Sequence, residues 1–482
     1  MTQTSWESTG EAWAALGGDP ALLSGVSAVV RDGALPARLP VIGLARACAG
    51  VCALAAAELT AARTGRQVPR VRVDDGAVAT AFTSERHLLV DGRAPVNFAP
   101  LSRFWRTADG WVRTHANYPH HRAALTAALG LADEPSVDTG DAGDAVDTVD
   151  MVTSVAACLA ERSAVEVEDA VYAAGGLAVA LRSPKEWTAH PQGAAVAAAP
   201  LLRRERSCDA PALPLPPLDG DPALPAQGVR VLDLTRVIAG PVATRTLALL
   251  GADVLRVDSP RLPELADQHA DTGFGKRSAT LDLEARADRR VFEELLARAD
   301  VVVTGYRPGT LDRFGLSPEA LAERRPGVVL AQLSAWGEDG PWAARRGFDS
   351  LVQVATGIAA VEGSPERPGA LPAQALDHGS GYLLAAAVLR ALTERSATGG
   401  THLARLSLAR TAAWLMGTGA HQAQQAQQVQ KTAYDGPGPW LTETDGPLGR
   451  LRHAVAPVSF EGGPDNWSRP PGAWGADRPA WR

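Results

Sequence analysis

The sequence is poor in residues that form disulfide frameworks or metal sites. Its 482 residues include only four cysteines, too few to staple a chain of this length. Cys48 and Cys52 lie four residues apart in an Ala-rich helical segment, so both are predicted to face one core as reduced thiols. Neither they nor the scattered histidines have companions at zinc-ligand spacing, so no metal site is predicted at His115, His120, His121 or His190.

The sequence also lacks a basic excess and a long apolar run. Its formal net charge of -7 argues against a binder of nucleic acids or membrane surfaces, because phosphate groups would be repelled. The N-terminus has neither the basic start nor the apolar core of a signal peptide. The longest apolar stretch, 47–59, is Ala-rich and is expected to be too short to span a bilayer. A cytoplasmic protein without nucleic-acid or membrane partners is therefore predicted.

What is present is enough apolar sequence for a large core in two or three domains, at 46% hydrophobic residues. Two linkers are predicted. Residues 133–150 are rich in Asp, Gly, Thr and Val with little helical period, and 208–227 hold six prolines and favour an extended tether. The last fifty residues are predicted to form an irregular arm, anchored by burial of Trp440, Trp467, Trp474 and Trp481.

The second half alternates short β-branched runs with helical segments. This alternation predicts βαβ units and a parallel sheet. Right-handed crossovers would place a ligand at the carboxyl ends of the strands. Strands are expected at 228–235, 252–258, 299–306 and 327–334, and helices at about 241–250, 288–298 and 317–325.

The two halves share a short internal repeat. Residues 52–74 and 386–408 each read as an Ala/Leu helix, a Thr-Gly stop and a strand. The stops are Thr64-Gly65 and Thr398-Gly399. Because the stop and the following strand both recur, duplication is favoured over a chance match between Ala-rich helices.

Four motifs follow one another in the second half. The turn Ala239-Gly240-Pro241 opens a helix whose free N–H groups suit a phosphate. After it come GKRSATLDL, TGYRPGTLDRFGL and AARRGFDSLVQVATG. In this order they resemble the family III CoA-transferases over about 228–415. The resemblance implies an α/β fold with a Rossmann-like parallel-sheet large domain and a smaller α+β domain. It also implies transfer of coenzyme A from an acyl-CoA to a carboxylic acid, with acyl-CoA as substrate and no tightly bound cofactor.

Asp377, in AQALDHGSGYLL, is the candidate nucleophile. Small residues follow it at a predicted helix start, where free N–H groups are expected to keep a carboxylate ionised and accessible. An ordinary N-cap aspartate is the alternative interpretation of the same pattern. By the mechanism that the resemblance implies, Asp377 attacks the thioester to give a mixed anhydride and then carries CoA as an aspartyl thioester.

The resemblance also implies which residues surround the coenzyme, although a plain surface charge is the alternative for each cation. Ile238 stands where formyl-CoA transferases have a glutamine, which argues against formyl-CoA or oxalate as substrate. Arg346 and Phe348 correspond to positions that line the acyl end. The expected contacts of the coenzyme are Ile238, Ala239, Lys276, Arg277, Tyr306, Arg307, Arg313 and Arg346.

Two other functions stay open. An α-methylacyl-CoA racemase shares the implied fold but has a histidine base where this sequence has Phe348. A racemase needs one base on each face of the α-carbon, and His378, beside Asp377, would not reach the opposite face. A non-catalytic CoA-binding relative is disfavoured because Asp377 is retained.

The first half is similar to the small domain of the same family, placed before the Rossmann-like segment. Its copy of the helix lacks an acid, since the position of Asp377 falls at Gly43 or Leu44, so it can pack but cannot act as a nucleophile. Either a homodimer or an internally completed pseudo-dimer remains open. The predicted parts are the acid-lacking copy (1–80), the small domain (81–207), the linker (208–227), the Rossmann-like domain (228–430) and the C-terminal arm (431–482).

Overall fold

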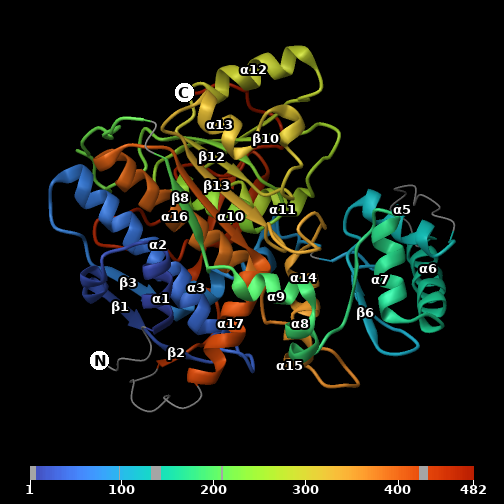
Figure 1. The fold of residues 1–482 in the computed structure, drawn as a ribbon. Coiled ribbons are helices and arrows are strands. Elements are labelled where there is room, and N and C mark those ends of the chain that lie inside the picture. Colours follow the sequence, from blue (N-terminus) through green and yellow to red (C-terminus); the bar gives the residue numbers. More distant parts are fainter. Residues whose placement is uncertain (1–6, 97, 132–142, 208–209, 423–431) are drawn as a thin grey trace.

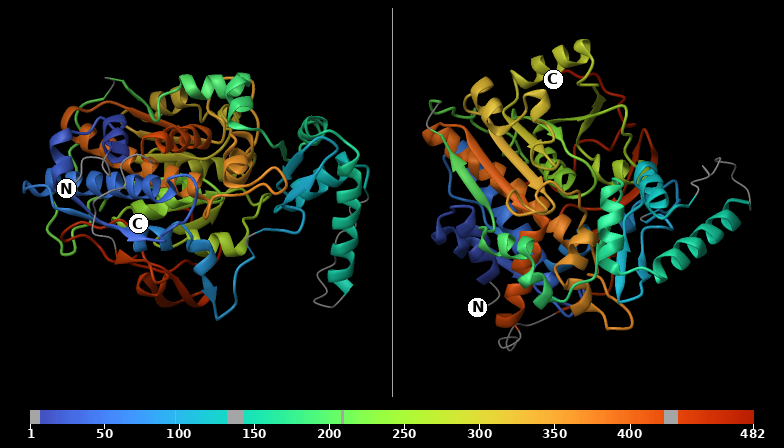
Figure 2. Two further views of the ribbon diagram at one scale, coloured as in Figure 1. Left: turned by 90° about the horizontal axis from the view of Figure 1, so that it is seen from below. Right: turned by 45° about the vertical axis from the view of Figure 1, so that its right-hand side comes forward.

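The computed structural model describes residues 7–482 except 97, 132–142, 208–209 and 423–431 (Figure 1). A large α/β domain holds most of the chain, and a small domain projects from one side of it (Figure 2). This is the architecture that the sequence predicts.

A seven-stranded sheet forms the centre of the large domain, in the order β11-β10-β9-β12-β13-β14-β8. All neighbouring strands are parallel except β8, which pairs antiparallel with β14. The strands are β8 (Arg203–Arg206), β9 (Arg230–Leu234), β10 (Asp253–Asp258), β11 (Arg277–Thr280), β12 (Val301–Thr304), β13 (Val329–Ser334) and β14 (His402–Ser407). The predicted parallel sheet is thus confirmed, and β11, in the motif that was expected to bind coenzyme, was not foreseen as a strand.

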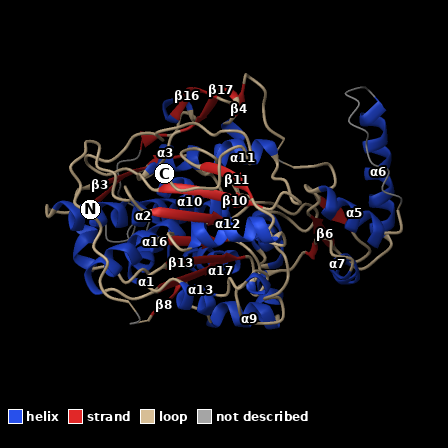
Figure 3. Ribbon diagram, turned by 90° about the horizontal axis from the view of Figure 1, so that it is seen from above, coloured by secondary structure: helices blue, strands red, loops and turns tan. Residues whose placement is uncertain are grey.

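Helices cover both faces of this sheet (Figure 3). Successive strand residues point to opposite faces, so Val231 joins the core under α10 (Ala239–Leu249) and α16 (Ala375–Thr398). Leu232 joins the core under α12 (Arg286–Leu296) and α13 (Pro318–Arg324). Because both faces are covered, the strands read as nearly continuous apolar runs rather than as alternating ones.

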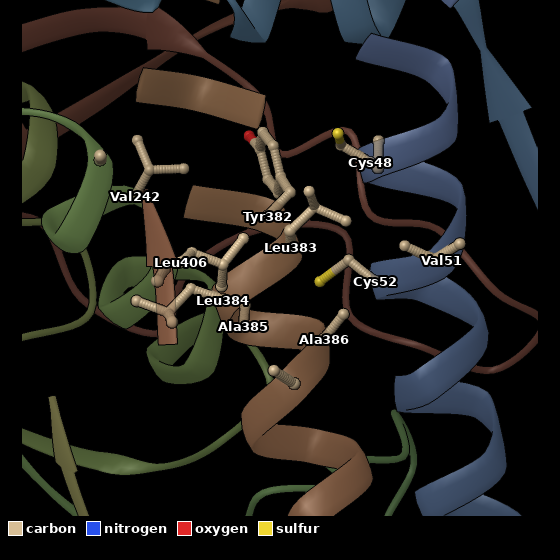
Figure 4. Packing of buried hydrophobic residues seen from close by; sticks show 14 of the residues in the cluster. Cys48, Val51, Cys52, Val242, Tyr382, Leu383, Leu384, Ala385, Ala386 and Leu406 are labelled. Atoms are coloured by element: carbon tan, nitrogen blue, oxygen red, sulfur yellow. The ribbon is translucent and has the colours of Figure 1, made fainter. Parts of the chain in front are cut away.

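The helix α16 is buried almost all round, and every residue from Ala375 to Leu392 is buried. It lies between α10 and the first-half helix α2 (Val41–Thr64), as Figure 4 shows. Small residues permit the close approach: a Cβ at Gly381 would lie 2.6 Å from the Ala239 carbonyl oxygen. Gly379 faces Leu44 and Cys48 of α2 in the same way. Both glycines therefore serve packing.

The internal repeat is present in space. Both α2 and α16 span 24 residues, and both end at a glycine with positive φ, 68° at Gly65 and 70° at Gly399. A strand follows each, β3 (Val71–Asp74) and β14. Gly43 precedes Gly65 by the same number of residues that separates Asp377 from Gly399. Gly43 is therefore the counterpart of the candidate nucleophile.

The expectation that the apolar run is too short to span a bilayer was wrong, because the helix extends beyond it. Within the described ranges, α2 is the one helix long and apolar enough to cross a membrane. Its apolar stretch is 83% buried inside the fold, however, so packing against α16 accounts for its composition. Cys48 and Cys52 face this core as predicted, both as free cysteines, and burial raises the pKa of both thiols.

The small domain packs three helices on a three-stranded antiparallel sheet, β5-β6-β7. The predicted linker 133–150 was wrong from Gly143 onward, where α6 begins; its earlier part, 133–142, lies outside the described residues. Val152, Val155 and Leu159 continue the helical period past the predicted boundary and pack into the core of this domain. Its elements are β5 (Phe104–Arg106), β6 (Trp111–Thr114), α5 (Pro119–Ala128), α6 (Gly143–Ala160), α7 (Ala164–Ala173) and β7 (Ala178–Ala180).

The chain returns to the large domain before the predicted boundary at residue 207, because β8 already belongs to the large sheet. The remaining elements pack around that domain. They are α1 (Glu7–Ala15), β1 (Val26–Val29), β2 (Arg31–Asp32), α3 (Asp75–Ala81), α4 (Ser84–His87), β4 (Leu89–Val90), α8 (Pro184–Ala189), α9 (Pro191–Ala198), α11 (Ala266–Thr272), α14 (Asp349–Ala355), α15 (Ile358–Glu362), α17 (Leu408–Gln422), β15 (Thr432–Ala433), β16 (Leu441–Gly446) and β17 (Gly449–Ala454).

The C-terminal arm is not irregular throughout, because β16 and β17 pair antiparallel and β17 also pairs with β4. Beyond them the chain crosses the large domain, held by tryptophans that are partly rather than fully buried. Their indole N–H groups donate to the Arg245 carbonyl at 2.8 Å, to Asp258 at 2.9 Å and to the Leu295 carbonyl at 2.9 Å. These donors are Trp467, Trp474 and Trp481.

Gly381→Ala is expected to lower the free energy of unfolding by about 1–3 kcal/mol, because the new methyl group meets the backbone of α10 in a filled core. Gly417→Ala is the matched control, since Gly417 also lies in a helix, α17, but has open space around it. There alanine should leave stability unchanged or raise it by up to about 1 kcal/mol. Chemical denaturation measures both, and equal effects would contradict this account of the helix contact.

Candidate active site

A cavity of about 620 Å³ lies between the large and the small domain. Its walls come from the carboxyl ends of β9, β12 and β13, from the first turns of α10 and α16, and from the start of α5. In a parallel sheet this edge is the usual place for a ligand. The lining side chains include Asp377, Tyr118, His120, His121, Arg236, Ala239, Tyr306, Arg307, Arg313, Arg345, Arg346 and Phe348.

Asp377 is the third residue of α16 and is only 6% exposed, at the wall of this cavity. Its backbone N–H and that of Leu376 both donate to Oδ2 of Asp349, at 3.0 and 2.9 Å. Asp349, from α14, therefore caps the helix that bears Asp377. Within the described part of the chain, the Asp377 carboxyl group forms no salt bridge.

Asp377 lines the cavity as expected of an accessible group, but its surroundings disfavour the ionised state that the sequence predicted. Burial raises the pKa of its carboxyl group well above the usual range, and the charges of Asp349 and Glu85 raise it further. Burial also raises the pKa of Asp349, to about 6, although it accepts hydrogen bonds from the helix N–H groups and from Gln353. The backbone N–H groups that were expected to stabilise the Asp377 carboxylate thus donate to Asp349 instead.

His378 points away from the cavity into the first half of the chain. Its side chain is fully buried, with Nε2 3.2 Å from Oε2 of Glu85 in α4. The ring of Phe82 lies 5.4 Å from the imidazole, centroid to centroid. His378 therefore contacts the first half and does not line the cavity with Asp377.

The small domain closes the other side of the cavity with aromatic rings. Tyr118 donates its hydroxyl hydrogen to Glu264 at 2.6 Å, and the ring of His115 stacks on Phe348 at 3.8 Å. His121 is 4% exposed and meets Phe348 edge-on. Burial, with His120 and nearby arginines, lowers the pKa of His121 to about 3, so this imidazole is neutral at physiological pH. The sequence placed His120-His121 at a helix start, which is confirmed, but not at the cavity.

Residues 14–216 and 226–439 match the CoA-transferase family III, and the short gap falls within the Pro-rich segment. The chain belongs to the CoA-transferase family III. Within the described residues, no three His, Cys, Asp or Glu side chains come together as a metal ion would require.

Individual relatives of this family III chain match it over part of its length. It is 37% identical over 193 residues to a probable fatty acyl-CoA transferase of Mycobacterium tuberculosis, covering 37% of this chain and 49% of that protein. It is 34% identical over 185 residues to the formyl-CoA:oxalate CoA-transferase of Streptomyces coelicolor, covering 36% and 47%. The chain thus spans about half the length of these curated relatives.

Solved structures also match only part of the chain. A hypothetical protein from Mycobacterium tuberculosis is 35% identical, with a TM-score of 0.39 over 43% of this chain and 60% of that one. A CAIB/BAIF family protein from Brucella suis is 26% identical, with a TM-score of 0.38 over 48% and 66%.

The structure brings most of the expected coenzyme contacts of this family III chain to one cavity. Ala239, Tyr306, Arg307, Arg313 and Arg346 line it together with Asp377. Arg236 and Arg345 also line the cavity. They were not predicted from the sequence, because both lie in loops whose course depends on tertiary contacts. Ile238 lies just outside, buried at 6% as the residue before α10.

Lys276 and Arg277 do not reach this cavity. Lys276 is buried and donates to Asp233 at 3.1 Å and to the Pro241 carbonyl at 2.9 Å. Arg277 opens the edge strand β11 and pairs with Asp253 at 2.7 Å. Since β11 starts inside this motif, both side chains neutralise carboxylates of the sheet rather than face the cavity.

Asp377→Asn is expected to stabilise the protein at high pH. A carboxyl group with a raised pKa in the folded state favours folding only while protonated, so its stability contribution is lost as pH rises through that pKa. Each unit of pKa corresponds to about 1.4 kcal/mol. The variant should therefore gain more than about 1 kcal/mol in free energy of unfolding near pH 8 and little near pH 4.

Asp74→Asn is the control with the opposite sign. Burial raises the pKa of Asp74, but the hydrogen bonds from Arg31 and from the Gly76 N–H, with the charges of Arg31 and Arg72, together lower it below the usual value. This carboxylate therefore stabilises the fold at neutral pH and loses that effect in acid. Denaturation across the pH range would contradict the account if Asp377→Asn lost stability near pH 8 as Asp74→Asn should.

Proposed function

We propose that this chain transfers coenzyme A from an acyl-CoA thioester to a carboxylic acid, with Asp377 as the nucleophile. One observation carries the proposal: Asp377, the carboxylate of the expected catalytic motif, lines the same cavity as Tyr306, Arg307, Arg313 and Arg346. The arginines suit the phosphates of coenzyme A, and the aromatic ring suits its adenine. The partners are then small substrates, an acyl-CoA and a free acid.

The proposed reaction has two symmetrical halves. The Asp377 carboxylate attacks the carbonyl carbon of the donor thioester, which forms a mixed anhydride and releases CoA thiolate. The thiolate attacks the aspartyl carbonyl, which gives an aspartyl-CoA thioester and the donor acid. The acceptor carboxylate then attacks this thioester to form a second anhydride, and the thiolate attacks the acceptor carbonyl to give the new acyl-CoA and free Asp377.

Burial of Asp377 favours this chemistry once its carboxyl group is ionised. A carboxylate with a raised pKa is more basic, and it has little bound water to shed before it attacks. Ala239 and Gly240 line the cavity at the first turn of α10, where backbone N–H groups lack partners within the helix. We assign them the oxyanion of each tetrahedral step.

One structural observation, which the sequence did not predict, favours the racemase alternative. His121, from the small domain, lines the cavity on the side of Phe348, where a racemase would hold its histidine base. Its lowered pKa of about 3 makes it a weak base at neutral pH, so a transferase, which needs no second base, fits better. The three described cysteines are free, which fits a reducing cytoplasm for either enzyme.

Asp377→Asn should reduce transfer from a panel of acyl-CoA donors to free acids by at least about 10³-fold, since the attacking oxygen is lost. With the unchanged chain, hydroxylamine should leave a hydroxamate on the peptide that contains Asp377. Tandem mass spectrometry locates it. Turnover that survives the substitution would exclude this role, and solvent deuterium entering C2 of a 2-methylacyl-CoA without CoA transfer would indicate a racemase.

Arg307→Gln should raise the dissociation constant of CoA about 10–100-fold, because it removes a charge-assisted contact to phosphate. Arg277→Gln is the matched control, since Arg277 pairs with Asp253 away from the cavity, and it should leave CoA affinity unchanged. Isothermal titration with CoA measures both. An effect of Arg277→Gln as large as that of Arg307→Gln would restore the original expectation for the GKRSATLDL motif.

A further inference from the structure

We infer that the acid-lacking first half completes the Asp377 site within the same chain, and that Glu85 is its positioning residue. The inference rests on the proposed function of Asp377. The first half cannot supply a nucleophile, because Gly43 stands at the corresponding place in α2. Instead, it supplies the Glu85 carboxylate on the side of α16 away from the cavity, and the rings of Tyr118 and His121 on the cavity side.

Glu85 approaches α16 from the side opposite the cavity. Its carboxylate is 11% exposed and lies 3.2 Å from the imidazole of His378, the residue that follows Asp377. Phe82, one turn earlier in the chain, packs its ring on His378 and stacks on Tyr382 at 5.7 Å. The first turn of α16 is thus fixed by a polar contact and an aromatic contact, both from the first half.

A buried network holds Glu85 in place. Ser84 donates to Asp271 at 2.9 Å, and Arg245 donates to Ser84 at 3.1 Å and to Asp271 at 3.0 Å. These three side chains come from α4, α11 and α10, and all are buried. Because the network joins α4 rigidly to the large domain, the position of Glu85 relative to α16 is fixed.

The charge of Glu85 acts on Asp377. Two carboxylates on separate elements, Asp349 of α14 and Glu85 of α4, carry charges that disfavour the ionisation of Asp377 in addition to burial. Asp349 accepts a hydrogen bond from the Asp377 N–H, and Glu85 contacts the next residue, His378. Removing either charge should let Asp377 ionise at lower pH. The other titratable or charged groups around this cluster are Arg86 and His87 of α4, Arg113 of β6, His121 of α5, Arg245 of α10, Asp271 of α11, and His378 and Tyr382 of α16.

The same half of the chain closes the cavity from the front. Tyr118 and His121 of the small domain face Asp377 across it, and Arg236 of the large domain lies over the Tyr118 ring at 5.1 Å. One chain therefore contains the nucleophile, the residues behind it and the residues opposite it. These contacts need no residue of a second copy.

Glu85→Gln tests whether the charge of Glu85 acts on Asp377, because glutamine retains the hydrogen bond to His378 and removes only the charge. Glu58→Gln is the matched control: Glu58 of α2 also joins the first half to α16, through Arg390 at 2.5 Å, but this contact lies about three helical turns from Asp377. The readout is the rate of aspartyl-thioester formation in single turnover with an acyl-CoA, measured across pH.

With Glu85→Gln the acid limb of this profile should move to lower pH, and with Glu58→Gln it should stay in place. A limb that stays in place for both variants, or moves equally for both, overturns the role of Glu85. If the unchanged chain forms no aspartyl thioester at any pH, the proposed function fails instead, so the two failures can be told apart.

Coexpression tests whether completion occurs within one chain. Glu85→Gln chains are coexpressed with an excess of Asp377→Asn chains, which carry an intact Glu85 but no nucleophile. If each site is completed by its own chain, the pH profile remains that of Glu85→Gln alone. If the first half of one chain serves the Asp377 of another, the acid limb of the unchanged protein reappears, which would overturn completion in cis.

Discussion

The burial of one helix start governs this molecule. The first turn of α16 lies inside the protein, where its N–H groups must find acceptors, and the Asp349 carboxylate accepts two of them. Because these two N–H groups donate to Asp349, they do not stabilise the Asp377 carboxyl group. That group is poorly solvated, and the charges of Asp349 and Glu85 disfavour its ionisation. When ionised, the buried Asp377 carboxylate destabilises the fold, but it is well suited to attack a thioester. This is the usual trade-off between stability and activity.

The first half of the chain packs around α16. The repeat packs α2 along α16 with matched length and matched glycine ends, and Gly43 leaves the second copy without chemistry. Since this half has no nucleophile, its contribution is structural. Cys48 and Leu44 pack against α16, Glu85 places a carboxylate beside His378, and the rings of Tyr118 and His121 line the cavity. A duplicated chain can therefore hold one complete site by dividing the work between its copies.

The sequence predicted the elements and much of the site, since β-branched runs define β9, β12 and β13 and a local motif marks Asp377. Other features depend on contacts between distant segments. Lys276 and Arg277 were expected at the coenzyme, but the pairing of β11 directs them to Asp233 and Asp253. Glu85 and His121 reach the site only through the packing of one half on the other, and the raised pKa of Asp377 follows from burial that no local pattern encodes.

The central claim is that Asp377 exchanges an oxygen atom with its substrates. In the proposed reaction the donor acid leaves with one oxygen of Asp377, and the acceptor acid restores that oxygen. After turnover with an acceptor labelled with ¹⁸O in its carboxylate, the peptide containing Asp377 should carry the heavy isotope, as mass spectrometry can detect. A peptide that stays unlabelled through many turnovers, while labelled acyl-CoA accumulates, would contradict a covalent role for Asp377.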